Sequence, residues 1–315
     1  MIEESTMSCL NMRIRKLFCL GLFLACALGG SALIAQETVR VASISFVPEK
    51  FALTENARRL ETAFREASSR GAQIALAPEG ILEGYVVNEI IAGEVDEQRM
   101  REVAVSVEDP LIKGFRALAR ELRMCLAFGF AELIDGDVFN SAIFIDHEGE
   151  ISGKYHKMQF HEGYHPDWWF NRLGETSRTF ETPFGRCGFL ICNDRWNPDL
   201  ARIPSLDGAQ FLLIPAYGSR STSQDEAVAS RSRENGIPVI EANVGVQLVT
   251  DGSGRIVALD REMEGITVAD IVIAPVALPQ IEERDSVELS FKRWREKEMR
   301  SRYQATMERI ERDSK

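Results

Sequence analysis

Apolar residues follow two different spacings along the chain, and the two alternate between residues 38 and 273. Between residues 54 and 71 the apolar positions, among them Leu60 and Phe64, recur every three or four residues, which predicts an amphipathic helix. Short apolar runs bounded by polar or turn residues predict strands instead. The expected strands are 38–46, 74–77, 126–131, 141–145, 151–155, 188–192, 211–215, 238–243, 247–250, 256–259 and 266–273, and the further helices are 111–123 and 225–235. This alternation predicts a layered α/β architecture with two sheets.

The end of the chain reads as a charged helix. Its apolar positions form a broken stripe of Phe291, Trp294, Tyr303, Met307 and Ile310. We expect this stripe to pack on a partner subunit, which would make the protein a homo-oligomer, or across the chain's own body. A solvated helix with scattered apolar residues is the alternative.

Residues 1–35 have the order of a secretory signal. Basic residues at 13–16 precede an apolar run over 17–28, and small residues follow up to Ala35, after which we expect cleavage. Met12 is an alternative start, because the residues before it add no targeting pattern. The protein is therefore expected to be exported, to the periplasm or out of the cell, without stable membrane insertion. An uncleaved anchor built on the same apolar run is the alternative, although its glycines weaken a membrane span.

The remaining chain shows no repeat, low-complexity segment or flexible linker, so we expect one domain over 36–280 and a helical tail over 281–315. Composition narrows the class of ligand. Lys and Arg total 37 against 48 Asp and Glu, which gives a net charge of -11. This excess of negative charge disfavours a phosphate-binding surface, so nucleic acid is not an expected partner. A small molecule is the expected ligand.

Three cysteines, Cys125, Cys187 and Cys192, follow the signal. An odd number leaves at least one thiol unpaired in an oxidising compartment, and such a thiol is a candidate reactive group. If Cys187 and Cys192 share one strand, five steps of about 3.3 Å separate them by far more than a disulfide allows. We therefore do not expect these two to bridge each other.

Three residues with catalytic chemistry stand at or near the ends of predicted strands. Glu79 follows the apolar run in IALAPEG, Lys157 follows the strand in GKYHKMQF, and Cys192 ends the strand in GFLICND. Alternation along the second of these strands sends Lys154 and Lys157 to opposite faces. Each residue alone is more typical of a solvated or structural position, so the inference depends on the three together.

Together these residues resemble the nitrilase superfamily of carbon-nitrogen hydrolases, whose glutamate, lysine and cysteine occur in this order and context. The segments GRCGFLICND and RSRENGIPVIEANVG are similar to the family's nucleophile strand and to the segment that follows it. Gln159 stands where the family usually has a histidine. The resemblance covers roughly residues 39–275 and implies a four-layer αββα sandwich, here followed by the helical tail.

The chemistry of amide hydrolysis gives each of these residues a role. The reaction needs a nucleophile, a base that activates it, an acid for the leaving amine and a positive dipole for the oxyanion. We expect Cys192 to attack, Glu79 to transfer protons, and Lys157 with the backbone N–H of Asn193 to stabilise the oxyanion. The intermediate would be a thioester on Cys192, formed without a metal or cofactor.

The resemblance also implies a second acid between the lysine and the cysteine. Counting back about 25 residues from Cys192, the family's usual interval, reaches Asp167 in HPDWWF. Glu162 is the rival for this role. The structural alternative for Asp167 is a turn or cap after Pro166.

Arg195 bears on the class of substrate. The segment CNDRWNPD is similar to the cysteine segment of the family's N-carbamoyl-amino-acid amidohydrolases, which implies an amide or ureido substrate whose carboxylate pairs with this arginine. Trp196 and Asn197 depart from those relatives. The structural alternative is that Arg195 pairs with Asp194, Asp199 or another loop acid and braces the turn.

Two other classes of function stay open. His161 and His165 lie four residues apart beside Glu162 and Asp167, a spacing that would suit a metal-dependent hydrolase, although a nearby glycine and proline disfavour the helix this requires. A binding protein on a catalytically dead hydrolase scaffold is the second alternative.

Overall fold

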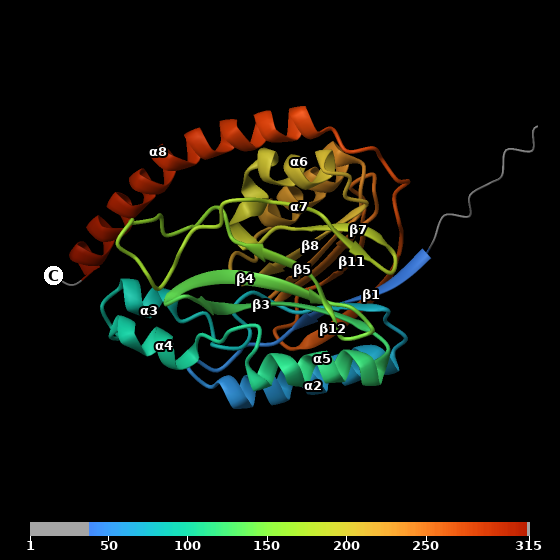
Figure 1. The fold of residues 1–315 in the computed structure, drawn as a ribbon, viewed down its shortest axis with the longest axis horizontal. Helices are drawn as coiled ribbons and strands as arrows, with labels where there is room; N and C mark the ends of the chain where they lie inside the picture. The colour runs from blue at the N-terminus through green and yellow to red at the C-terminus, as the bar shows by residue number, and fades with distance from the viewer. Residues whose placement is uncertain (1–37, 314–315) are drawn as a thin grey trace, which may run out of the picture. The chain divides into compact units, whose positions relative to one another are not determined.

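Two six-stranded mixed sheets stack face to face in the computed structural model, which describes residues 38–313 (Figure 1). The first sheet has the order β12-β1-β2-β3-β4-β5, and the second has the order β11-β10-β9-β8-β7-β6. In each sheet three neighbouring strands run parallel, β1-β2-β3 and β7-β8-β9, and the outer strands pair antiparallel. The strands are β1 (Thr38–Ser45), β2 (Ile74–Leu76), β3 (Cys125–Ile134), β4 (Asp137–Ile145), β5 (Ile151–His156), β6 (Phe180–Thr182), β7 (Gly185–Phe189), β8 (Phe211–Ala216), β9 (Val239–Asn243), β10 (Val246–Thr250), β11 (Ile256–Asp260) and β12 (Gly265–Val272).

Helices cover the outer face of each sheet. The helices are α2 (Leu53–Ser69), α3 (Val87–Ile91), α4 (Met100–Val103), α5 (Pro110–Leu122), α6 (Pro198–Leu206), α7 (Thr222–Asn235) and α8 (Ile281–Asp313), with 3-10 turns η1 (Glu97–Arg99) and η2 (Cys192–Trp196). Helices α2 and α5 pack on the first sheet, and α6 and α7 pack on the second (Figure 1). Phe64 of α2 and Phe115 of α5 meet Phe128 of β3 in the core beneath those helices. The expected αββα order of layers is confirmed.

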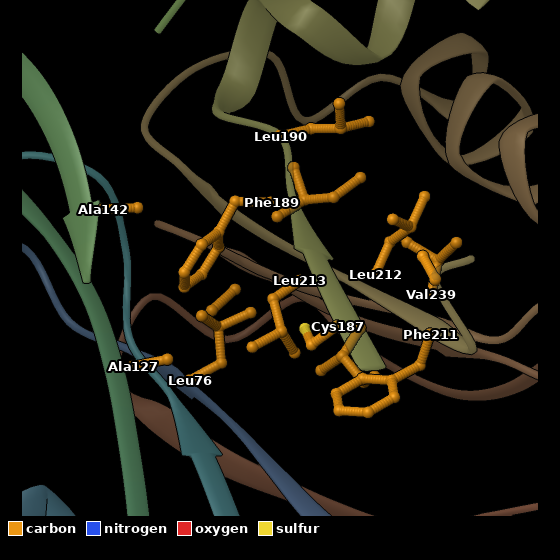
Figure 2. Packing of buried hydrophobic residues seen from close by; sticks show 14 of the residues in the cluster. Leu76, Ala127, Ala142, Cys187, Phe189, Leu190, Phe211, Leu212, Leu213 and Val239 are labelled. Carbon is orange, nitrogen blue, oxygen red and sulfur yellow. The ribbon is translucent and has the colours of Figure 1, made fainter. Parts of the chain in front are cut away.

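The apolar faces of the two sheets meet in a common core. Figure 2 shows Phe189 and Leu213 of the second sheet turned toward Leu76 and Ala127 of the first, and all four are buried. Burial raises the pKa of the Cys187 thiol in this core well above its ordinary value, so this cysteine serves packing. The three cysteines of the described residues are free thiols, in agreement with the expectation that Cys187 and Cys192 do not form a disulfide.

Most of the expected helices and strands are present with ends shifted by a few residues. The main difference is β7, which ends at Phe189 because the chain leaves the sheet and turns into η2 at Cys192. The hydrophobic pattern does not indicate α3, α4, α6 or β6, because each has nine residues or fewer and shows no complete repeat of its spacing.

Helix α8 packs across the body of its own chain. Figure 1 shows it passing over α6 and continuing beside the yellow-green loop that follows β5. Phe291 and Met299 are buried, and Arg295 Nη1 donates to Gly174 O at 2.6 Å, whereas Trp294 is 42% exposed. The solvated helix is therefore excluded, and packing on the chain's own body, one of the two expected arrangements, is confirmed.

The expected signal, with its cleavage point after Ala35, lies outside the described residues. Within 38–313 no helix is both long enough and apolar enough to cross a bilayer.

Candidate active site

Three side chains from both sheets converge where their strands end. Glu79 follows β2 and Lys157 follows β5, both in the first sheet, and Cys192 follows β7 in the second. Glu79 and Lys157 are completely buried, and Cys192 is 8% exposed. The side chain of Lys154 is 37% exposed, so the expected opposite faces of the two lysines are confirmed.

The carboxylate of Glu79 is held by three hydrogen bonds. Its Oε1 accepts from Lys157 Nζ at 2.6 Å and from Asn140 Nδ2 at 2.7 Å. Its Oε2 accepts from the backbone N–H of Tyr217 at 3.0 Å. Because the carboxylate is desolvated, these donors fix its orientation and offset the cost of burying its charge.

Gly129 on β3 allows the Glu79 loop to lie directly against the first sheet. A Cβ at this position would lie 2.7 Å from Glu79 Cα, closer than any side chain tolerates. Without that side chain the two backbones join through Gly129 N to Pro78 O and Ile81 N to Gly129 O, each at 3.0 Å. These two bonds continue the hydrogen bonding of the sheet edge into the Glu79 loop.

Cys192 has a strained backbone at the first position of η2. Its φ of 45° lies in the left-handed region, which costs a residue with a side chain about 1 kcal/mol or more. The turn aims the thiol at Gly218, where a Cβ would lie 3.2 Å from Sγ. Backbone strain that the surrounding structure maintains is typical of functional sites.

Asp194 holds this turn in place. Its Oδ2 accepts from Ile191 N at 2.9 Å and from Tyr155 Oη at 2.8 Å, and its Oδ1 accepts from Gln159 N at 2.9 Å. These bonds connect the cysteine turn with the segment that carries Lys157. Burial raises the pKa of Asp194 to about 6 despite the positive charge of that lysine.

One residue, Tyr217, contacts both Glu79 and Cys192. Its N–H donates to Glu79 Oε2, and its carbonyl oxygen accepts from Cys192 Sγ at 3.8 Å. Its ring stacks on Tyr85, with centroids 5.4 Å apart, and Lys157 Nζ lies 5.7 Å from the centre of the Tyr85 ring. The backbone of Tyr217 therefore sets the carboxylate and the thiol at a fixed separation.

Burial controls the charge states in this cluster. Burial, with a smaller contribution from the charge of Glu79, raises the pKa of the Cys192 thiol to about 11, while Lys157 and Arg195 oppose the shift. For Lys157, burial lowers the pKa, but the charges of the surrounding acidic groups, led by Glu79 and including Glu162, together outweigh burial and raise the pKa well above its ordinary value. At neutral pH the nucleophile is thus a protonated thiol beside an ammonium, and it requires a base.

Asn193 follows the nucleophile on η2, and the role of its backbone N–H toward the oxyanion stays a prediction. It is 5% exposed and lines the same cavity as Cys192. Its Nδ2 donates to Gln159 O at 3.3 Å, and Gln159 Nε2 returns a bond to Asn193 O at 3.5 Å. The glutamine at the family's histidine position therefore contacts the residue after the nucleophile.

The structure places Glu162 and not Asp167 at the site. Glu162 is 4% exposed, lines the cavity of Cys192, accepts from Asn171 Nδ2 at 2.8 Å and is among the charges that raise the pKa of Lys157. The side chain of Asp167 is 88% exposed and faces His165. The expectation for Asp167 is therefore wrong as to its position. Glu162 precedes Cys192 by 30 residues (192 minus 162), so the family's usual interval of about 25 residues does not reach it.

Arg195 is buried and ion-paired, with 1% of its side chain exposed. Its Nη1 donates to Glu241 on β9, a strand acid distant in sequence and not Asp194 or Asp199. Burial and the Arg195 charge act oppositely on Glu241, and burial prevails, raising the pKa of this carboxyl to about 7. The ion pair is structural, but its partner is a strand acid and not the loop acid of the structural alternative. Arg195 also lines the cavity, and its role toward substrate stays a prediction.

A cavity of about 630 Å³ opens above Cys192. Its walls include the Tyr85 and Tyr217 rings, Glu162 and, from helix α8, Arg302. A larger cavity of about 1010 Å³ lies between α8 and the segment 164–175, but it contains none of the three convergent residues, so the chemistry assigns the site to the smaller one.

The histidines are separated by the fold. His161 lines the cavity of the nucleophile, whereas His165 lines the larger cavity and packs on Tyr303. Within residues 38–313 no group of three or more His, Cys, Asp or Glu side chains is arranged to hold a metal. The spacing of His161 and His165 therefore does not become a ligand set.

Asn140, Tyr217 and Asp194 belong to the site but not to the set expected from sequence. Asn140 is on β4, 61 positions from the carboxylate that it contacts, and Tyr217 acts through its backbone. Only Asp194, the last residue of the segment GRCGFLICND, has a local signal, since an acid in a turn commonly accepts backbone N–H bonds.

A sandwich of two sheets with a buried glutamate, lysine and cysteine at their strand ends defines a carbon-nitrogen hydrolase of the nitrilase type. Residues 40–278 match the carbon-nitrogen hydrolase family, and the chain belongs to that family.

Relatives in this family include enzymes that act on ureido compounds. The chain is 27% identical over 263 residues to a citrullinase from Francisella tularensis, covering 75% of this chain and 89% of the relative. It is 32% identical over 219 residues to an N-carbamoylputrescine amidase from Oryza sativa, covering 68% and 69%. An amidase structure from Nesterenkonia sp. has a TM-score of 0.64 at 22% identity, covering 79% of this chain and 95% of that one, and it confirms the fold.

Proposed function

We propose that this protein hydrolyses a linear amide or ureido compound through a thioester on Cys192, releasing ammonia or an amine. The observation that carries the proposal is the bridge made by Tyr217, which holds the Glu79 carboxylate and the Cys192 thiol on one peptide segment while Lys157 binds the same carboxylate. The names of the citrullinase and N-carbamoylputrescine amidase relatives support the substrate class.

The first half of the reaction begins with Glu79 as general base. The high pKa of the buried Cys192 thiol means that the proton must be removed as the sulfur attacks the carbonyl carbon. Lys157 and the backbone N–H of Asn193 then stabilise the oxyanion, and the ammonium stays charged because Glu79 holds its pKa high. Glu79 returns the proton to the leaving nitrogen, and ammonia or an amine departs.

The second half uses the same groups on water. Glu79 takes a proton from the water that attacks the thioester, and a second oxyanion forms between Lys157 and the Asn193 N–H. Collapse of this species returns the proton to the Cys192 sulfur. The product is a carboxylic acid from an amide, or a carbamic acid from a ureido group.

Glu162 is the proposed second acid. Its buried carboxylate lies in the field of Lys157 and is held by Asn171. We assign it the role of orienting Lys157 and keeping that group protonated through both tetrahedral species, because the ammonium must not lose its proton to the substrate.

Export and self-association are proposals that rest on the sequence. The basic stretch, apolar run and small residues ending at Ala35 support export through a cleaved signal. The exposed indole of Trp294 on α8 is one apolar group that a second subunit would cover. Mass spectrometry of the secreted chain and sedimentation of the mature protein test the two proposals separately.

The test of the activity is a panel of linear amides, ureido acids, alkylureas and nitriles, with ammonia release as the readout. We expect turnover of amide or ureido members by the wild type and none by Cys192→Ala. Thermal stability of that variant should remain within about 2 kcal/mol, because the thiol is small. If the wild type turns over no member, and iodoacetamide modifies Cys192 no faster than free cysteine, the dead-scaffold alternative replaces the proposal.

A further inference from the structure

The cavity above Cys192 contains few charged groups. Among the described residues that line it, Glu162 is the one carboxylate, and Arg195 and Arg302 are the two arginines. Glu162 is bound to Asn171 and lies in the field of Lys157, so it is part of the catalytic cluster. The charge that remains available to a substrate is therefore positive.

The two arginines differ in their surroundings. Arg195 is 1% exposed and donates to Glu241, which also accepts from Gln224 Nε2, so its charge is balanced within the protein. The side chain of Arg302 is 29% exposed. A partly hydrated guanidinium at a cavity wall binds an anion at much lower desolvation cost than a buried one.

Arg302 uses only one edge of its guanidinium within the protein. Its Nε donates to Glu298 Oε1 at 2.8 Å, one helical turn earlier on α8. Its terminal Nη groups make no hydrogen bond to a residue in the described range 38–313. These two nitrogens form the fork that binds a carboxylate in a bidentate manner.

The turn of α8 that carries Arg302 is fixed on the active-site loop. Tyr164 N donates to Met299 O at 3.1 Å, and Met299 is 2% exposed. At Gly163, with φ +83°, a Cβ would lie 2.1 Å from Tyr303 N, so loop and helix backbones are in direct contact. Because the same loop carries Glu162, Arg302 has a defined position relative to the catalytic cluster.

His161 does not compete with Arg302 for an anion. Its ring is partly buried in the same cavity, and burial lowers its pKa below the ordinary value, with the charges of Arg302 and Arg309 acting in the same direction as burial and that of Glu162 opposing them. At neutral pH the imidazole is therefore uncharged, and Arg302 supplies the cation at this wall.

We propose that Arg302 on the tail helix determines substrate specificity by pairing with a carboxylate at the end of the substrate remote from the scissile carbonyl. This inference rests on the proposed function and narrows its substrate class to anionic amides or ureido acids. An ammonium at the same position would be repelled by the positive charge of Arg302, and Glu162 is the one carboxylate among the described residues of the cavity wall. A diamine derivative is therefore a poor substrate.

Three ureas of matched length test the inference: 4-ureidobutyrate, N-butylurea and N-carbamoylputrescine, which end in a carboxylate, a methyl and an ammonium group. The variants are Arg302→Gln and the control Arg300→Gln. Arg300 is on the same helix and makes the same kind of ion pair one turn back, to Glu296, but it lines the other cavity. The values of kcat and KM are measured separately by ammonia release.

For the wild type we expect kcat/KM for 4-ureidobutyrate to exceed that for N-butylurea by at least tenfold, with N-carbamoylputrescine lowest. Arg302→Gln should remove this preference, mainly through KM, and leave N-butylurea within about threefold, whereas Arg300→Gln should change neither. Three results would overturn the inference: a preference that survives Arg302→Gln, an equal loss on all three ureas, or a wild-type preference for the ammonium compound. In each case turnover of N-butylurea would still support the proposed function. Hydrolysis of none of the three by the wild type would overturn the inference, and the amide members of the panel above would then decide the proposed function.

Discussion

The charge of Glu162 should matter to catalysis, and that of Asp167 should not. Glu162→Gln preserves the volume of the side chain and the oxygen that accepts from Asn171, so the change is confined to the negative charge near Lys157. A charge-assisted interaction of a buried group contributes about 2 to 3 kcal/mol, which corresponds to a loss of roughly 30- to 150-fold in kcat/KM. Asp167→Asn alters a carboxylate that is 88% exposed, and we expect a change of less than about twofold.

The pH profile identifies the reason for the loss. Glu162 raises the pKa of Lys157, so its neutralisation lowers that pKa. The ammonium is the active form and activity falls as pH rises through its pKa, so the alkaline limb of kcat should move to lower pH in Glu162→Gln and stay unchanged in Asp167→Asn.

The alkaline limb of the wild type lies above 10.5, the ordinary pKa of lysine, so the assay is ammonia release from pH 6 upward past that value. Circular dichroism confirms at each pH that both variants are folded. Equal losses in the two variants, or a Glu162→Gln profile that is merely scaled down without a shift of its alkaline limb, would refute the role of this carboxylate. A larger loss in Asp167→Asn would restore the acid expected from the residue count.

Three further predictions concern stability. Burial raises the pKa of Glu83 to about 7, above its unfolded value, so its contribution to stability grows by about 1 kcal/mol as the pH falls from 8 to 6. Glu83→Gln should therefore flatten the dependence of Tm on pH over that range, and an unchanged slope would contradict this. Phe291→Ala should destabilise the fold by about 3 to 5 kcal/mol in urea unfolding, because Phe291 is completely buried under α8. The control Trp294→Ala should cost less than about 1 kcal/mol, and equal effects would mean that α8 does not pack as described. Arg195→Gln should cost about 3 kcal/mol because Glu241 is left buried without its cation, and the loss should shrink when Glu241→Gln is added; additive losses would show that the pair is not coupled.

The layers of the fold follow from the sequence because they depend on local spacing. The helical positions Leu60 and Phe64 are buried as their period requires, and the alternation that separates Lys154 from Lys157 holds in the structure. Each of these predictions uses only residues within one element.

The second acid was misplaced because its position depends on the path of a loop. Glu162 and Asp167 are five residues apart in one irregular segment, which lies against α8 through the backbone of Gly163. No local pattern encodes that contact. The same reason applies to Asn140 and Arg302, which reach the site from β4 and from the tail through tertiary packing.

The central claim is that Cys192 forms a covalent acyl intermediate. Its most direct test is intact-mass and peptide mass spectrometry of the protein quenched in acid during turnover of a linear amide or ureido substrate. We predict an increase equal to the acyl group, located on the peptide that contains Cys192. Cys125 and Cys187 should stay unmodified because both are completely buried and neither lines the cavity. The adduct should be absent from Cys192→Ala. Steady turnover with no adduct on Cys192, or turnover that persists in Cys192→Ala, would contradict the account.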